Sequence, residues 1–183
     1  MMPSPAAFWH SVGKATSQIV VLSGDIGAGK TTWCARLATH VRAQRLHVAG
    51  LLSLGVFDAG EKIAIDLLDL SSGEQRRLAV RRSTPDPHSM TRNWQFEPAT
   101  LAWGDAVLGA LNACDLLIID ELGPLELLHN QGWQNAFLLL KKRQYRVACV
   151  VVRRALAPIF CERFPVAQTF MLDRTGDSPE SPG

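Results

Sequence analysis

The residues best suited to chemistry stand together near the amino end, in the sequence Gly24-Asp25-Ile26-Gly27-Ala28-Gly29-Lys30-Thr31. This stretch fills every fixed position of the phosphate-binding loop pattern G-x-x-x-x-G-K-[ST]. The glycines allow the backbone to turn its N–H groups inward, where they can donate hydrogen bonds to phosphate oxygens. In such a loop Lys30 would contact the β- and γ-phosphates, and the Thr31 hydroxyl would ligate Mg²⁺. The stretch therefore predicts a nucleoside-triphosphate site.

A second group suited to chemistry is the acidic pair Asp120-Glu121, which follows an apolar run at residues 116–119. An aspartate at the end of a buried strand is typical of a Walker B motif, in which it holds Mg²⁺ through the water shell of the ion. The neighbouring Glu121 can orient or deprotonate an attacking water. Because a kinase must keep water away from the γ-phosphate, this carboxylate favours hydrolysis. Two solvated acids at a strand end are the alternative interpretation of the pair.

The elements around these residues follow the pattern of an α/β protein. Residues 18–22 form a short apolar run that predicts a buried strand, and residues 30–43 carry apolar side chains at helical spacing. Further buried strands are predicted at residues 115–120, 145–152 and 166–172, with helices between them. This alternation predicts three layers with a mostly parallel central sheet, in which ligands lie beyond the carboxyl ends of the strands. Both candidate groups stand at such ends.

The part of the chain at about residues 53–82 has a different pattern. Turn signals there separate short strands predicted at residues 47–56, 62–70 and 75–82. Turns this tight can connect only antiparallel neighbours, so we expect a small β-meander inserted at one side of the sheet. Residues 83–95, which are rich in Pro, Ser, Thr and Asn, are expected to form a loop that could reach a nucleotide.

The length and composition of the chain indicate one folded domain. Its 183 residues, with 47% hydrophobic and 20% charged side chains, are typical of an ordinary globular protein. We assign this domain to residues 18–172. Residues 1–17 are expected to form a loose extension in which Phe8 and Trp9 contact the domain, and residues 173–183 a disordered polar tail.

The composition also argues against several classes of protein. The formal net charge of +2 is too small to indicate nucleic-acid binding, and no apolar stretch has the ~18 residues that a membrane span needs. The amino end lacks the pattern of a secretory signal. The four cysteines are scattered without disulfide or metal-ligand spacing, so they indicate a reduced, cytoplasmic protein without a structural metal.

The sequence also carries a resemblance to a known family. The stretch Asp120-Glu121-Leu122-Gly123-Pro124-Leu125-Glu126-Leu127, together with Gly27-Ala28-Gly29-Lys30-Thr31-Thr32, resembles the small nucleoside-triphosphatase family described from thermophiles and as a cancer-related animal NTPase. Residues 63–73 resemble the β-meander of that family, and the resemblance covers about residues 19–164. It implies a RecA-like P-loop fold and Mg²⁺-dependent removal of the terminal phosphate from several nucleotides. ATP, GTP, CTP and UTP are the expected ligands.

The resemblance also implies roles for individual residues. The implied phosphate-binding residues are Gly24, Asp25, Ile26, Gly27, Ala28, Gly29, Lys30, Thr31 and Thr32. Asp120 would serve the metal together with Thr31, and Glu121 would be the base. Glu126 is better suited to fixing a loop than to catalysis. Arg153, which follows the strand at residues 145–152, is a candidate for neutralising charge on the γ-phosphoryl group, with a solvated side chain as the alternative.

Two other functions stay open at this point. A P-loop kinase, or a GTP-dependent helper of cofactor assembly, would share the phosphate loop and the chain length. A nucleotide-switched binding module or motor subunit would act on nucleic acid or on an unidentified protein partner. The region after the strand at residues 145–152 is too short for the helical lid of AAA+ motors. Release of phosphate without any acceptor would separate a hydrolase from a kinase.

Overall fold

An eight-stranded sheet forms the centre of the computed structural model, which describes residues 3–14, 16–87, 89 and 91–172. The strands are β1 (Gln18–Gly24), β2 (Val48–Asp58), β3 (Glu61–Asp69), β4 (Gln75–Arg81), β5 (Trp94–Phe96), β6 (Cys114–Leu122), β7 (Tyr145–Val152) and β8 (Val166–Leu172). Their spatial order is β5-β4-β3-β2-β6-β7-β1-β8. The five strands from β2 to β8 in this order pair in parallel, and the three at the other end are antiparallel.

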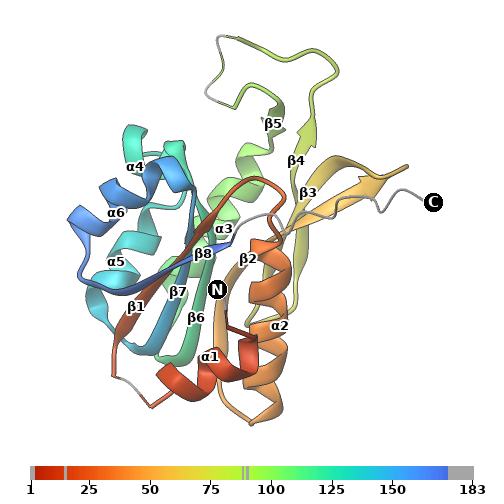
Figure 1. The fold of residues 1–183 in the computed structure, drawn as a ribbon. Helices are drawn as coiled ribbons and strands as arrows, with labels where there is room; N and C mark the ends of the chain where they lie inside the picture. Colours follow the sequence, from red (N-terminus) through yellow and green to blue (C-terminus); the bar gives the residue numbers. More distant parts are fainter. Residues whose placement is uncertain (1–2, 15, 88, 90, 173–183) are drawn as a thin grey trace, which may run out of the picture.

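Helices cover both faces of the sheet and complete the predicted three layers (Figure 1). The helices are α1 (Pro5–Val12), α2 (Lys30–Ala43), α3 (Pro98–Ala110), α4 (Pro124–His129), α5 (Gln134–Lys142) and α6 (Ala157–Arg163), with a 3₁₀ turn η1 (Arg154–Leu156). One apolar core lies between the sheet and α1 with α2. The other lies between the sheet and α3, α5 and α6. The predicted fold class is thereby confirmed.

The parallel strands bring their carboxyl ends to one edge of the sheet. β1 lies between β7 and β8, and β6 lies between β2 and β7. The register pairs Leu22 of β1 with Val151 of β7, and Ile119 of β6 with Val150. The segments that follow β1, β6 and β7 therefore leave the sheet as neighbours, although they lie far apart in the sequence.

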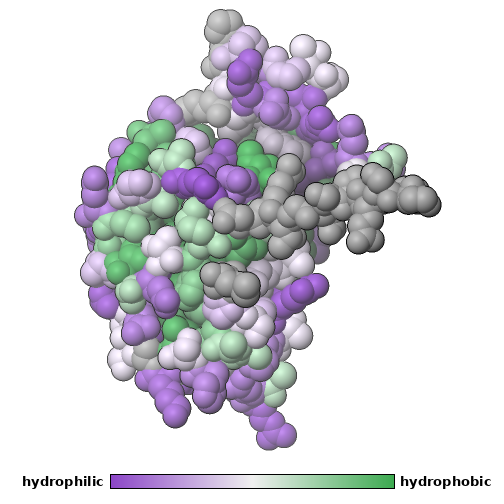
Figure 2. All heavy atoms as spheres, in the orientation of Figure 1, coloured by the Kyte–Doolittle hydropathy of each residue, from purple (hydrophilic) through white to green (hydrophobic). Residues whose placement is uncertain are grey.

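The predicted meander is present, with one more strand than expected. β2 and β3 form a long antiparallel hairpin, β4 pairs with β3, and β5 pairs with β4. The expected loop at residues 83–95 therefore ends two residues early, because Trp94 and Gln95 already pair with Arg81 and Val80. The segment between β4 and β5 projects from the body of the molecule, and its described surface is mostly hydrophilic (Figures 1 and 2).

The amino end corrects the expectation of a loose extension. Ser4 caps the helix α1 by accepting a hydrogen bond from the Ala7 N–H at 3.2 Å. Phe8 is fully buried, and its ring packs edge-on against Trp33 of α2 and Phe170 of β8. The prediction that Phe8 and Trp9 contact the domain is borne out, but they do so from a helix.

Two further details of the sequence prediction are settled here. The helix α4, which directly follows β6, was not predicted, and β6 continues two residues past Asp120. The predicted tail at residues 173–183 lies outside the described residues. None of the helices in the described ranges combines the length and the apolar composition that a membrane crossing requires.

Candidate active site

The phosphate-binding loop lies between β1 and α2, at the carboxyl edge of the sheet. Gly24, Gly27 and Gly29 all have positive φ angles, of 147°, 80° and 85°. Residues that carry a Cβ atom rarely adopt these backbone conformations, so the glycine spacing of the motif is what allows the loop to curl. Gly29 is also the residue before α2, and the unpaired N–H groups and positive dipole end of that helix face the loop.

Lys30 lies inside this loop and is 7% exposed. Its Nζ donates hydrogen bonds to the backbone carbonyl oxygens of Gly24, at 2.9 Å, and Asp25, at 2.7 Å. These carbonyls hold the ammonium within the concave side of the loop. A bound phosphate would meet a cation that the backbone has already oriented, so little side-chain entropy is lost on binding.

Asp120 lies at the end of β6 and is 2% exposed. Its carboxylate accepts hydrogen bonds from the Thr31 side chain and from the Ser53 N–H, the latter at 3.3 Å. Burial is the largest influence on this group and raises the pKa of Asp120 to about 7, whereas the bonds from Thr31 and Ser53 and the nearby Lys30 charge oppose that rise. The sequence-predicted metal residues Thr31 and Asp120 are therefore in contact.

Glu121 and Arg153 form an ion pair beside this aspartate, with 2.5 Å between Oε1 and Nε. The two side chains come from the ends of β6 and β7, and are 26% and 47% exposed. Arg154 lies next along the chain, and its Nε is 3.6 Å from the Asp25 carboxylate in the phosphate loop. The end of β7 thus contacts both the acidic pair and the loop.

Glu126 has the loop-fixing geometry that the sequence favoured. It is 5% exposed, and its two carboxylate oxygens accept hydrogen bonds from the Gly123 N–H at 3.0 Å and the Trp133 N–H at 3.2 Å. Burial raises the pKa of Glu126, against the opposing effect of these backbone donors. The side chain therefore joins the start of α4 to the start of α5, behind the acidic pair.

The oxygen atoms beside the loop are suitable ligands for a hard divalent cation. Thr31 and Asp120 supply oxygen atoms, which Mg²⁺ prefers, and phosphate oxygens and water would complete its coordination. In the described part of the chain, no group of three or more His, Cys, Asp or Glu side chains is placed to hold a metal ion by itself. The Asp120 carboxylate is also protected from competing solvent by its burial.

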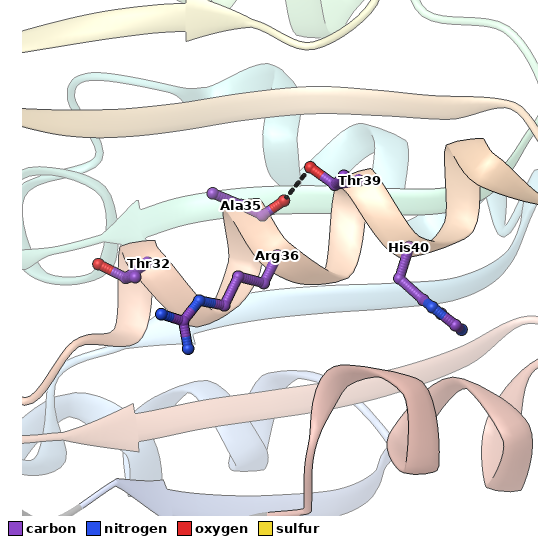
Figure 3. Close-up of a pocket in the computed structure, with 5 residues that line it drawn as sticks. All are labelled: Thr32, Ala35, Arg36, Thr39 and His40. Atoms are coloured by element: carbon purple, nitrogen blue, oxygen red, sulfur yellow. Dashed lines mark hydrogen bonds between the residues drawn. The ribbon is translucent and has the colours of Figure 1, made fainter.

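An open groove of about 460 Å³ runs along the outer face of α2, beginning one residue after Thr31 (Figure 3). The residues that line it are Thr32, Ala35, Arg36, Thr39 and His40. In Figure 3 the Arg36 guanidinium extends back along the helix toward Thr32. Side chains on a helix lean toward its amino end, which explains this direction. Of the predicted phosphate-binding residues, only Thr32 lines this groove.

Two residues near the acidic pair were missed by the sequence analysis. Ser53 of β2 donates its hydroxyl to the Asp120 carbonyl oxygen at 2.5 Å, in addition to its N–H bond to the carboxylate. Lys62 of β3 lies close enough for the Asp120 and Glu121 charges to affect its pKa. Neither residue belongs to a motif, and Ser53 is 67 positions from Asp120 in the sequence, so no sequence signal pointed to them.

Comparison with known protein sequences identifies relatives. The sequence profile of the NTPase family matches residues 19–171. Relatives named nucleoside-triphosphatase THEP1 include one from Caldivirga maquilingensis, 28% identical over 112 residues, and one from Methanopyrus kandleri, 30% identical over 111 residues. The first match covers 61% of this chain and 62% of the relative, and the second covers 61% of each. The chain thus spans somewhat less than two thirds of these relatives.

Solved structures show the same fold. The human cancer-related nucleoside triphosphatase superposes with a TM-score of 0.58 at 21% identity, over 84% of this chain and 88% of that one. THEP1 from Aquifex aeolicus superposes with a TM-score of 0.52 at 15% identity, over 88% of this chain and 92% of that one. At such identities the likeness concerns the three-layer fold alone.

Proposed function

We propose a function from the premise that this chain belongs to the NTPase family: it hydrolyses nucleoside triphosphates and releases their terminal phosphate. One observation carries the proposal. The Glu121 carboxylate lies beside the buried Asp120 and is paired with Arg153, at the strand edge from which the phosphate loop also begins. Glu121, which would orient water, and the cations Lys30 and Arg153 would thus surround the γ-phosphate of a nucleotide bound to the loop.

The phosphate loop would bind the triphosphate. Its inward N–H groups and the amino end of α2 attract anionic oxygens, and Lys30 would exchange its two carbonyl partners for the β- and γ-phosphates. Thr32, an exposed residue in the first turn of α2, would bind the α-phosphate through its hydroxyl. Binding and positioning supply most of the catalysis in phosphoryl transfer, because the protein itself makes no covalent bond.

Glu121 and Arg153 would act on the reacting groups. The Glu121 carboxylate accepts a proton from the attacking water or orients it in line with the γ-phosphorus. Arg153, released from Glu121, turns its guanidinium to the γ-phosphoryl oxygens, where negative charge is redistributed in the transition state. The water oxygen bonds to the γ-phosphorus while the bond from that phosphorus to the β,γ-bridging oxygen breaks, so the nucleoside diphosphate is the leaving group. Inorganic phosphate and the diphosphate are then released.

Thr31 and Asp120 would hold the divalent cation, which we propose to be Mg²⁺. When bound, such an ion neutralises charge on the β- and γ-phosphate oxygens. The positive charge also favours the deprotonated form of Asp120, whose burial disfavours ionisation. Ser53 keeps the aspartate in place by bonding both its carboxylate and its carbonyl oxygen.

The substrate range is proposed to be broad and to include ATP, GTP, CTP and UTP. The residues assigned above all address phosphate, and the groove along α2 would leave the base on an open surface. An open surface discriminates weakly between bases, because few of their polar groups become buried against protein partners. The cytoplasmic location and a protein partner stay predictions.

Phosphate release by the purified protein tests this function. The protein is incubated with Mg²⁺ and each of the four triphosphates, beside the variant Glu121→Gln, and nucleotide binding is measured in parallel. We expect release without any acceptor, and a loss of about 10²–10⁴-fold in the variant, the range typical of a general base. Binding should survive, because the loop is unchanged.

Other outcomes would assign a different function. A wild-type protein that binds nucleotide and releases no phosphate is not a hydrolase under these conditions, and adding candidate acceptor hydroxyl compounds would then test the kinase alternative. Release that is unchanged in Glu121→Gln would remove this residue from the water-activating role. Chelation with EDTA should abolish release in the wild type, and failure to do so would contradict the metal assignment.

A further inference from the structure

The hairpin of β2 and β3 carries a lysine toward the site from the side opposite the phosphate loop. Lys62 pairs with Phe57 across the hairpin. Ser53, Gly55 and Phe57 alternate along β2 and so share one face of that strand. Ser53 is bonded to Asp120 at the end of β6. This face of β2 therefore leads from the acidic pair to the stem of Lys62.

Gly55 makes room for the lysine. A Cβ atom at this position would lie 3.1 Å from Cε of Lys62 and 2.8 Å from the ring of Phe57. Both contacts are shorter than ordinary van der Waals distances. The stem of Lys62 can lie across β2 because residue 55 has no side chain, so the direction of the ammonium is set by packing.

The ring of Trp94 also holds this lysine. Nζ of Lys62 lies 5.5 Å from the ring centroid, within the range of a cation–π interaction. Trp94 itself is fixed by Thr91, whose carbonyl oxygen accepts from the Trp94 N–H and whose hydroxyl donates to the Trp94 carbonyl oxygen, both at 2.9 Å. The ammonium is thus held by β5, the strand that the sequence did not predict.

The charge of Lys62 differs from those of the arginines on the same insertion. Arg76, Arg77 and Arg81 each pair with a carboxylate of the insertion, Glu74, Asp66 and Glu61 respectively. No ion pair forms between Lys62 and a carboxylate of the described residues. Partial burial lowers the pKa of Lys62, while the more distant charges of Asp120 and Glu121 oppose that effect.

We propose that Lys62 binds the terminal phosphate of the bound nucleotide, so that the meander contributes a third cation to the site. The inference rests on the proposed function for the identity of the ligand. Lys30 approaches the phosphates from the loop and Arg153 from β7, whereas Lys62 approaches from β3. A contact with the terminal phosphate alone favours triphosphates over diphosphates, and this preference promotes release of the product.

Binding measurements without turnover test the proposal. Calorimetric titration with Mg²⁺ compares a non-hydrolysable β,γ-imido triphosphate with the corresponding diphosphate. We expect Lys62→Met to weaken binding of the triphosphate about tenfold and binding of the diphosphate less than about twofold, as for loss of one charged hydrogen bond. Lys62→Arg should restore most of the affinity, and Trp94→Leu should cause a smaller loss with the same selectivity for the triphosphate.

The matched control is Arg76→Met. Arg76 of the same insertion also lies over an indole ring, with its Cζ 4.4 Å from the ring centroid of Trp103 in α3, but it pairs with Glu74. It should leave both affinities unchanged. Two results would each overturn the proposal. One is an unchanged ratio of triphosphate to diphosphate affinity in Lys62→Met, whether both affinities fall equally or neither falls. The other is the same selective loss of triphosphate affinity in Arg76→Met. Because no hydrolysis is measured, this result is independent of whether phosphate is released.

Discussion

The two halves of the site are built in different ways. The half formed by the phosphate loop comes from eight consecutive residues, and its ligands are backbone N–H groups, one lysine and one hydroxyl. The opposite half comes from the ends and edges of several strands, and its groups are side chains: Asp120 and Glu121 of β6, Arg153 after β7, and Lys62 of β3. The first half depends on local backbone conformation, and the second on the register of the sheet.

This difference teaches where each half can be disrupted. A loop held by glycine conformations fails when one glycine is replaced, even if no side chain in the site changes. A half assembled from side chains fails gradually, because each group has its own partner. The predictions below test this contrast, starting with the largest expected effect.

Lys30→Met should have the largest effect of the four variants compared here. The substitution removes the cation that the Gly24 and Asp25 carbonyls orient within the loop. We expect phosphate release to fall by about 10³-fold, near the upper range for one preorganised donor to a reacting anion. Lys141→Met, at an exposed lysine of α5, is the control and should have wild-type rates. A loss below tenfold in Lys30→Met would place the triphosphate elsewhere.

Gly24→Ala should disrupt the half of the site formed by the phosphate loop by lowering the free energy of unfolding. At φ 147° an added Cβ would lie 2.0 Å from the carbonyl oxygen of Leu172 in β8, so β8 must move away from β1. We expect a loss of about 3 kcal/mol in the free energy of unfolding, as for strain plus overpacking. Gly60→Ala is the control, because it has φ 83° but no atom within 4 Å of the added Cβ. Denaturant titration of both variants separates the clash from the positive φ alone.

Arg153→Gln should weaken the other half by a smaller amount. We expect kcat for phosphate release to fall about 10²-fold with little change in nucleotide affinity, because the guanidinium acts on charge in the transition state. Arg146→Gln removes a comparable ion pair, with Asp115 at 3.0 Å, at the opposite edge of the sheet and should not change kcat. An increase in rate on losing Arg153 would show instead that this residue restrains Glu121.

Glu126→Gln should have the smallest effect and should act on stability. The substitution replaces one carboxylate oxygen by an NH₂ group, which cannot accept a hydrogen bond. Either the Gly123 N–H or the Trp133 N–H then loses its acceptor, and both of these donors are buried. We expect a loss of about 1.5 kcal/mol, within the range for an unsatisfied buried donor. Thermal unfolding measures it, with Glu162→Gln on the exposed side of α6 as the control. A rate loss as large as that of Glu121→Gln would assign a catalytic role to Glu126.

The sequence by itself determined the parts of this protein whose physics is local. Glycine spacing specified the loop conformation, the apolar alternation specified the strands, and tight turns specified the antiparallel meander. The acidic pair could be placed at the correct edge because parallel strands all end there. Helix α1 was not predicted: an eight-residue helix is not stable alone, and it forms here because Phe8 packs on Trp33.

Tertiary structure alone decided which side chains meet. Ser53 reaches Asp120 because β2 pairs with β6, Arg153 reaches Glu121 because β7 lies on the other side of β6, and both pairings join residues more than 30 positions apart. Lys62 depends on a glycine in one strand and a tryptophan in another. Such contacts depend on strand order and register, which are set by packing of the whole sheet and leave no pattern in the neighbouring sequence.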